Sequence, residues 1–141
     1  MADEIRVRSM IQIDKDGLKY VNKGSDFLKD MATAKGPSPG SFTPDVTGTI
    51  IDLSQLASYG GCIFKNYDAT NKVEFGFFIN NVFYPLAEIG PGEEWAYYLS
   101  ENLGEQYGTA GTGTTGAALD DYLMARSIDA VCNISVEIFE R

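Results

Sequence analysis

Apolar and polar residues alternate in short segments along most of this chain, and turn-forming residues close each segment. In the last segment, 131–140, the even positions from 132 to 138 are apolar and the odd positions between them are polar. A period of two residues is typical of a β-strand with one buried face. No long segment follows a helical period. The pattern predicts an all-β fold, namely an antiparallel β-sandwich of jelly-roll-like type.

The same alternation places the other strands and the turns between them. Strands are predicted at 4–14, 18–21, 46–53, 61–67, 72–79, 82–88, 94–99 and 118–126. Turns are predicted at 16–17, 68–71 and 90–92, where Asp, Asn, Gly and Pro favour turn conformations. Pro85 marks its segment as an edge strand, because proline cannot donate a hydrogen bond to a sheet.

Two N-terminal segments need separate comment. In 4–14, the residues Ile5, Val7, Ile11 and Ile13 lie mainly at period two, which predicts a strand with one buried face. The segment 25–34 fits a short helix capped by Ser25 nearly as well as it fits a strand.

Composition changes near residue 44. A chain of 141 residues suits one domain. Residues 36–44 hold three of the five prolines and two glycines, which predicts a connector or an extended arm without regular structure. Residues 1–44 carry seven basic and six acidic side chains, whereas residues 45–141 carry four and fourteen. We therefore expect a Pro/Gly-hinged N-terminal segment, 1–44, that serves partly as an arm to a neighbouring subunit, and a β-sandwich body, 45–141.

The absence of histidine removes several kinds of chemistry. A chain without histidine has no Ser-His-Asp or Cys-His catalytic group and no histidine-ligated metal. The formal net charge of -9 opposes binding to a phosphate backbone, so we expect no nucleic-acid partner. The apolar runs are too short to span a membrane, and we expect no secretory leader, because residues 1–10 carry acidic side chains and no apolar run. The sequence predicts a soluble, non-enzymatic protein made in a reducing cytosol.

The remaining chemical motifs are weak. Residues 111–116 match G-x-G-x-x-G, but in a Gly/Thr-rich tract without the flanking strand and helix of a nucleotide site we expect a mobile loop. Cys62 and Cys132 lie 70 residues apart beside apolar neighbours, so we expect free core thiols. Turn 68–71 offers too few oxygen ligands for calcium. We expect no cofactor and no metal.

Aromatic residues are concentrated in one part of the body. Eight of the 17 aromatic side chains lie between 75 and 98. Strand alternation places them on both faces of their strands, whereas a sandwich buries only one face of each strand. An extended core, a protein interface and a sugar-stacking platform remain open as explanations. The candidate interface residues are Phe78, Tyr84, Trp95, Tyr97 and Tyr98.

Four segments resemble small virion proteins of tailed bacteriophages. They are FKNYDATNKVEFG at 64–76, FYPL at 83–86, IGPGE at 89–93 and SVEIFE at 135–140. In that family the layout is an N-x-D-x-x-N turn, a V-E-x-G strand, an aromatic-Pro edge strand, a P-G-E turn and a closing V-E-x-x-x-E strand. The resemblance covers 60–99 and 122–140, and it does not extend to the loop at 108–116 or to residues 1–40.

The resemblance implies a structural component of a virion. The expected role is that of a head decoration or cement protein that binds the major capsid protein and forms a homo-oligomer, with a trimer favoured. A tail or head–tail component and a carbohydrate-binding adhesin module are the alternatives. The expected location is the virion, after synthesis in the cytoplasm of a host bacterium.

Overall fold

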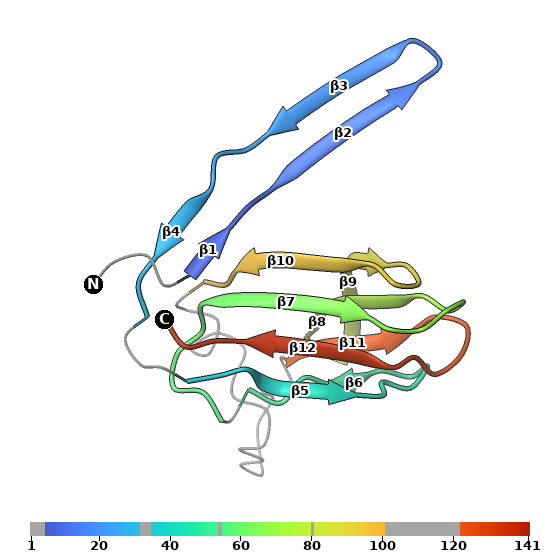
Figure 1. Cartoon of the computed structure of the whole chain (residues 1–141). Coiled ribbons are helices and arrows are strands. Elements are labelled where there is room, and N and C mark those ends of the chain that lie inside the picture. Colours follow the sequence, from blue (N-terminus) through green and yellow to red (C-terminus); the bar gives the residue numbers. More distant parts are fainter. Residues whose placement is uncertain (1–4, 32–34, 54, 80, 101–121) are drawn as a thin grey trace.

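The protein is built from β-strands that form two sheets in a body and a protruding arm (Figure 1). The computed structural model describes residues 5–31, 35–53, 55–79, 81–100 and 122–141, and every regular element in these ranges is a strand. All strand pairs are antiparallel. The prediction of an all-β antiparallel fold is confirmed.

The body comprises the eight strands β5 to β12. One sheet has the order β10-β7-β12-β5, and its strands are β5 (Ser38–Phe42), β7 (Gly61–Asn66), β10 (Glu94–Tyr98) and β12 (Ile134–Ile138). The other has the order β6-β11-β8-β9, and its strands are β6 (Thr49–Ile50), β8 (Val73–Ile79), β9 (Val82–Ile89) and β11 (Tyr122–Ser127). The outermost pair in sequence is β5 with β12, followed inward by β6 with β11, β7 with β10 and β8 with β9. The body strands are therefore paired in a nested order.

The core lies between the two sheets. Alternate residues of β12, Ile134, Val136 and Ile138, are at most 1% exposed, as their period predicts. The Phe64 ring of one sheet stacks on the Phe75 ring of the other, with centroids 4.4 Å apart. The core of the body is thus shared by both sheets.

The arm comprises strands β1 to β4, residues 5–29. Its base is the pair β1 (Ile5–Val7) and β4 (Phe27–Lys29), and its outer part, here called the hairpin, is β2 (Met10–Lys15) with β3 (Leu18–Lys23). Asp16 and Gly17 form the predicted turn, with φ of 48° and 92°. Figure 1 shows the hairpin extending away from the body, and all residues of its two strands are exposed.

The structure corrects the prediction of one strand with a buried face at 4–14. The segment is divided between β1 and β2, and Val7 is buried, but Ile11 and Ile13 are 61% and 41% exposed. The alternation is real, but the body lies under β1 only. Segment 25–34, which fitted a helix or a strand, contains the short strand β4.

The connector predicted at 36–44 is also wrong. Residues Ser38–Phe42 form β5, which pairs with β12 along its whole length. Pro39 is compatible with this pairing because β5 is an edge strand, where a missing N–H leaves no neighbour without a bond. The strand predicted at 46–53 is shortened to β6, because the Asp45 carboxylate accepts hydrogen bonds from the N–H groups of Thr47 and Gly48 and makes a turn there.

The other strand and turn predictions agree with the structure where it describes the chain. Strand β9, which contains Pro85, lies at the edge of its sheet, as expected. Gly92 has a φ of 72° in the predicted turn, where the Glu93 N–H donates to the Gly90 carbonyl at 3.2 Å. The loop predicted at 108–116 and the first part of the strand predicted at 118–126 lie outside the described residues.

Candidate interaction surfaces

The two thiols are held in non-reactive surroundings. Burial raises the pKa of the Cys62 thiol to about 12, so the sulfur stays protonated at neutral pH. Burial also raises the pKa of Cys132, whose Sγ lies 3.4 Å from the Lys72 carbonyl, to which the thiol donates. Among the described residues, no group of three or more Cys, Asp or Glu is arranged to hold a metal ion.

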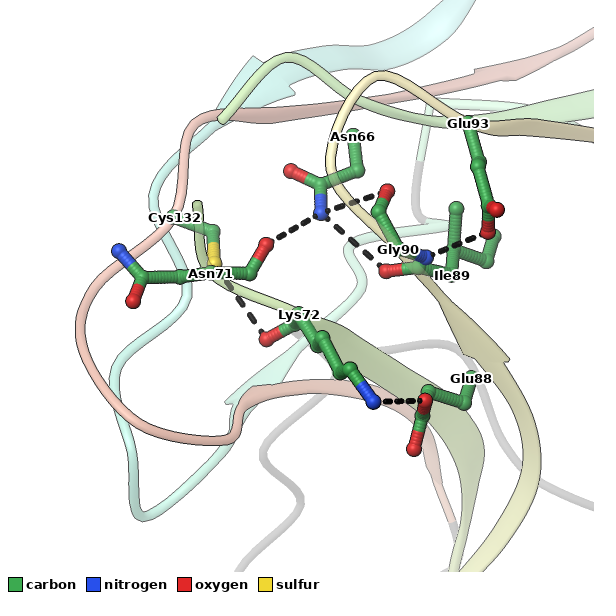
Figure 2. Close-up of polar contacts among 8 residues, drawn as sticks. All are labelled: Asn66, Asn71, Lys72, Glu88, Ile89, Gly90, Glu93 and Cys132. Atoms are coloured by element: carbon green, nitrogen blue, oxygen red, sulfur yellow. Dashed lines mark hydrogen bonds and ion pairs between the residues drawn. The ribbon is translucent and has the colours of Figure 1, made fainter. Parts of the chain in front are cut away.

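A buried asparagine joins the β7–β8 loop to the β9–β10 turn at one end of the body (Figure 2). The Asn66 side chain is fully buried, and its Nδ2 lies 2.9, 3.2 and 3.1 Å from the carbonyl oxygens of Asn71, Ile89 and Gly90. Its Oδ1 accepts a hydrogen bond from the Asp68 N–H. Every polar atom of the amide is therefore used within the protein, which identifies Asn66 as a structural residue.

Asp68 completes this turn. Its Oδ1 accepts hydrogen bonds from the N–H groups of Thr70 and Asn71 at 2.8 and 2.7 Å. These bonds, first that of Asn71 and then that of Thr70, hold the pKa of the carboxyl below its ordinary value. The N-x-D-x-x-N segment singled out in the sequence thus shapes a loop, in which the Oδ1 atoms of Asn66 and Asp68 accept hydrogen bonds from the chain's own N–H groups.

Two of the five candidate aromatic residues, Trp95 and Tyr97, lie together on the inner side of β10. Their ring centroids are 4.9 Å apart, and Tyr97 meets the core ring of Phe64 edge-on at 5.8 Å. Tyr97 is half-buried, whereas Trp95 is 39% exposed. Trp95 therefore continues the core to the margin of the sandwich.

Tyr98 lies on the opposite face of β10, against the arm. Its ring is 6.1 Å from Phe27 of β4, and the Lys29 ammonium lies 5.7 Å from its centroid. The Arg141 guanidinium lies 5.1 Å from the same ring. An apolar cavity of about 270 Å³ lies nearby, between the arm base and the outer face of the sheet, and Ile5 and Ala96 line it on opposite sides. Tyr98 contributes to the contact between arm and body.

The remaining two candidates lie on the second sheet. Tyr84, 53% exposed, is the cross-strand partner of Phe77 and shares the inner-facing side of β9. Phe78 pairs with Phe83, whose ring lies 4.5 Å from the Arg126 guanidinium on the outer face. The five residues thus occupy three places: Tyr84, Trp95 and Tyr97 along the margin, Tyr98 at the arm base, and Phe78 on the outer face.

The margin has a further apolar component that the aromatic count missed. Strands β9 and β10 each lie at one edge of their sheet and follow one another in the chain. Val82 and Leu86 are 49% and 60% exposed on β9. Leu86 lines an apolar cavity of about 40 Å³ together with Trp95 and Phe77. We call Val82, Tyr84, Leu86 and Trp95 the open margin.

The hairpin carries a second apolar surface that sequence reasoning assigned to the core. Residues directly opposite in an antiparallel pair project from the same face. The register pairs Ile13 with Tyr20, Lys15 with Leu18 and Ile11 with Asn22, so these six residues share one face. Ile11, Leu18 and Tyr20 are 61%, 61% and 48% exposed. We call this side, with Ile13, the apolar face of the hairpin.

The opposite face of the hairpin is more polar. It carries Met10 opposite Lys23, Gln12 opposite Val21 and Asp14 opposite Lys19. Asp14 and Lys19 form an ion pair of 3.9 Å. The period of two residues and the Asp-Gly turn in the sequence are sufficient to assign each residue to one of the two faces of the hairpin. They do not show whether other residues cover the apolar face.

Comparison with known proteins adds no relative: no family model, no curated protein and no solved structure matches the chain. In the ranges that the structure describes, no helix is long and apolar enough to cross a membrane.

Proposed function

We propose that this chain is a non-enzymatic structural protein of a tailed-bacteriophage virion, bound to the major capsid protein as a decoration or cement protein. The observation that carries the proposal is the exposed apolar face of a hairpin that extends from an acidic body. Such a surface is typical of a docking element. The phage-like motifs indicate that the partner is a virion protein; they lie at 64–76, 83–86, 89–93 and 135–140.

We also infer that the body is a jelly roll. The nested pairing of β5 with β12, β6 with β11, β7 with β10 and β8 with β9 supports this, because rolling up one long antiparallel ribbon brings strands together in that order. Jelly rolls are found among viral capsid and lectin domains. The fold analogy favours both a virion component and a carbohydrate-binding module, so the surfaces must decide between them.

The charge distribution supports a location on the outside of a particle. The body holds fourteen acidic and four basic side chains, and such a surface is repelled by packaged DNA. A decoration protein contacts the capsid lattice and solvent. The expected homo-oligomer, with a trimer favoured, would place its chains around a local symmetry axis of the particle.

Mass spectrometry of purified particles tests the proposal. We expect the chain in intact virions in a fixed ratio to the major capsid protein, and a particle reconstruction then distinguishes head from tail. Absence of the chain from intact particles would overturn the proposal.

The adhesin alternative has one specific observation in its favour, the exposed Trp95 beside Tyr97. It predicts binding to a glycan array that is lost in Trp95→Ala and retained in Tyr20→Ala, a matched aromatic change on the hairpin.

A further inference from the structure

We propose that the apolar face of the hairpin docks on the open margin of a second copy of this chain, so that each copy gives an arm and receives one. The choice of a second copy deepens the proposed function and rests on it in part, because a virion protein acts as a repeated unit. The contact itself is argued from two exposed surfaces, their charges and their lengths.

The hairpin needs a cover. A two-stranded hairpin is at best marginally stable in water, and packing against further structure is what stabilises one. Its apolar face holds Ile11, Ile13, Leu18 and Tyr20, each at least 41% exposed. Burying such side chains is favourable by roughly 25 cal/mol for each Å² of apolar surface removed from water.

The open margin is the matching surface on the body. Val82, Tyr84 and Leu86 are each about half exposed on β9, and Trp95 stands beside them on β10. From Val82 to Leu86 the strand covers roughly 13 Å, and so does the hairpin from Ile11 on β2 to Leu18, which lies opposite Lys15 on β3, at about 3.3 Å per residue. The two apolar rows therefore have equal lengths.

Charge favours contact between an arm and a body. Two bodies repel each other because each carries fourteen acidic and four basic side chains, whereas segment 1–44 has one more basic than acidic side chain. Among the six strand residues on the apolar face, Lys15 is the one charged side chain. Glu94 next to Trp95 is already paired with Lys65 at 3.3 Å, so Lys15 would be attracted by the net negative charge of the body and not by that one carboxylate.

The arm is held in a position that favours a second copy over its own body. Arg8 at the stem of the hairpin forms two hydrogen bonds with Asp26, at 2.6 and 3.0 Å. The Gly24 N–H donates to the Ser9 carbonyl at 3.0 Å and closes the stem. In this conformation the hairpin extends away from the body, as Figure 1 shows. Contact between two hairpins would leave the open margins uncovered, whereas arm-to-margin contact covers both surfaces in every copy.

An arm-to-margin contact joins two different surfaces. Contacts of this kind close into rings or continue as chains, depending on the rotation between neighbours. A ring of three is the closed form that agrees with the expected trimer.

Complementation between two variants tests the contact. The first, Ile13→Ser with Leu18→Ser, removes the apolar face, and the second, Leu86→Asp with Tyr84→Ser, removes the open margin. The matched control, Val21→Ser, changes an equally exposed residue on the other face of the hairpin. Circular dichroism melts on each full-length chain verify folding, because all these side chains are exposed.

Sedimentation velocity on the purified chains gives the result. We expect the wild type and the control to form oligomers, and each double variant to be monomeric, with a dissociation constant raised at least about 30-fold, as for the loss of a 2 kcal/mol interface anchor. A mixture of the two variants should form a 1:1 heterodimer, because one supplies an intact margin and the other an intact hairpin.

Three outcomes overturn the inference. A monomeric wild type rules out the contact, and a margin variant that assembles like the wild type shows that hairpins meet hairpins. Failure of the two monomeric variants to combine would exclude an exchange of different surfaces. A monomeric chain that is nevertheless found in particles would overturn this inference alone, and an oligomer absent from every particle would overturn the proposed function alone.

Discussion

Two hairpins of this protein have similar turns and opposite surroundings. β2–β3 and β8–β9 are both antiparallel pairs with a two-residue connection, and both connections contain a non-glycine residue of positive φ, Asp16 and Asn81. In β8, Val73 and Phe75 are at most 2% exposed, whereas every strand residue of β2–β3 is exposed. Strand β8 also pairs with β11. Local pattern makes a hairpin, and distant chain segments decide whether it is buried.

The largest effect that separates the two hairpins is expected for Phe75→Ala. Phe75 stacks on Phe64 across the core, and its truncation leaves a cavity that costs roughly 3–5 kcal/mol of unfolding free energy. At a protein concentration low enough to keep the chain monomeric, Tyr20→Ala on the exposed hairpin should change the same quantity by less than about 0.5 kcal/mol. Urea denaturation of both variants measures the difference, and equal losses would mean that the hairpin belongs to the core.

An intermediate effect is expected for Asn66→Ala. The change removes the buried amide that bridges three carbonyl oxygens, which should lower the free energy of unfolding by about 2–3 kcal/mol. The matched control is Asn22→Ala on the hairpin, whose amide donates to the exposed Tyr20 hydroxyl at 3.3 Å. A loss at Asn22 as large as that at Asn66 would remove the contrast between body and hairpin.

The acid side of the stability curve sharpens the contrast further. The pKa of Asp68 is lower in the folded state than its ordinary value of 3.8, so folding favours the ionised carboxylate over the protonated carboxyl group. The stabilisation is complete above pH 3.8 and is lost as the pH falls through the lower folded pKa. In Asp68→Asn the free energy of unfolding should therefore fall less steeply as the pH is lowered.

Thr70→Val is the control for that titration. It removes a hydroxyl contact of 3.3 Å but keeps the two N–H donors that lower the pKa most. Urea melts between pH 2 and 5 should show the parent slope in Thr70→Val and a smaller slope in Asp68→Asn. Identical slopes in all three proteins would assign the acid sensitivity to other carboxylates.

The smallest effect on stability is expected when the hairpin is removed. Since the Gly24 N–H already donates to the Ser9 carbonyl, an Asn-Gly turn can replace residues 10–23 and leave β1 and β4 in place. Measured at a protein concentration low enough to keep both chains monomeric, the free energy of unfolding should change by less than about 0.5 kcal/mol, because the removed residues bury little of the body. A loss above about 2 kcal/mol would show instead that the hairpin stabilises its own chain.

Sequence pattern predicted the strands better than their partners. Period two and the turn residues found β7, β8, β9, β10 and β12 to within one to three residues at each end. It missed β5 because Pro39 and Gly40 indicate an irregular connector, and only the pairing with β12, almost a hundred residues later, makes that segment a strand. Such long-range pairing leaves no mark in the local pattern.

The candidate surface was found in part for the same reason. Trp95 and Tyr84 were singled out as surplus aromatic residues, and both lie at the open margin. Ile11 and Ile13 were assigned to a core, because alternation shows that one face of a strand is apolar but does not identify what covers it. Exposure is a property of the whole chain in three dimensions.

The turn at Asp16 and Gly17 has a consequence for how the arm recognises anything. Side chains of a strand alternate, so a slip of one residue in the pairing would send Ile13 and Tyr20 to opposite sides. The left-handed φ values of Asp16 and Gly17 fix that register, and a two-residue connection leaves no slack for another. Asp16 and Gly17 thus determine which side chains the arm presents on its apolar face.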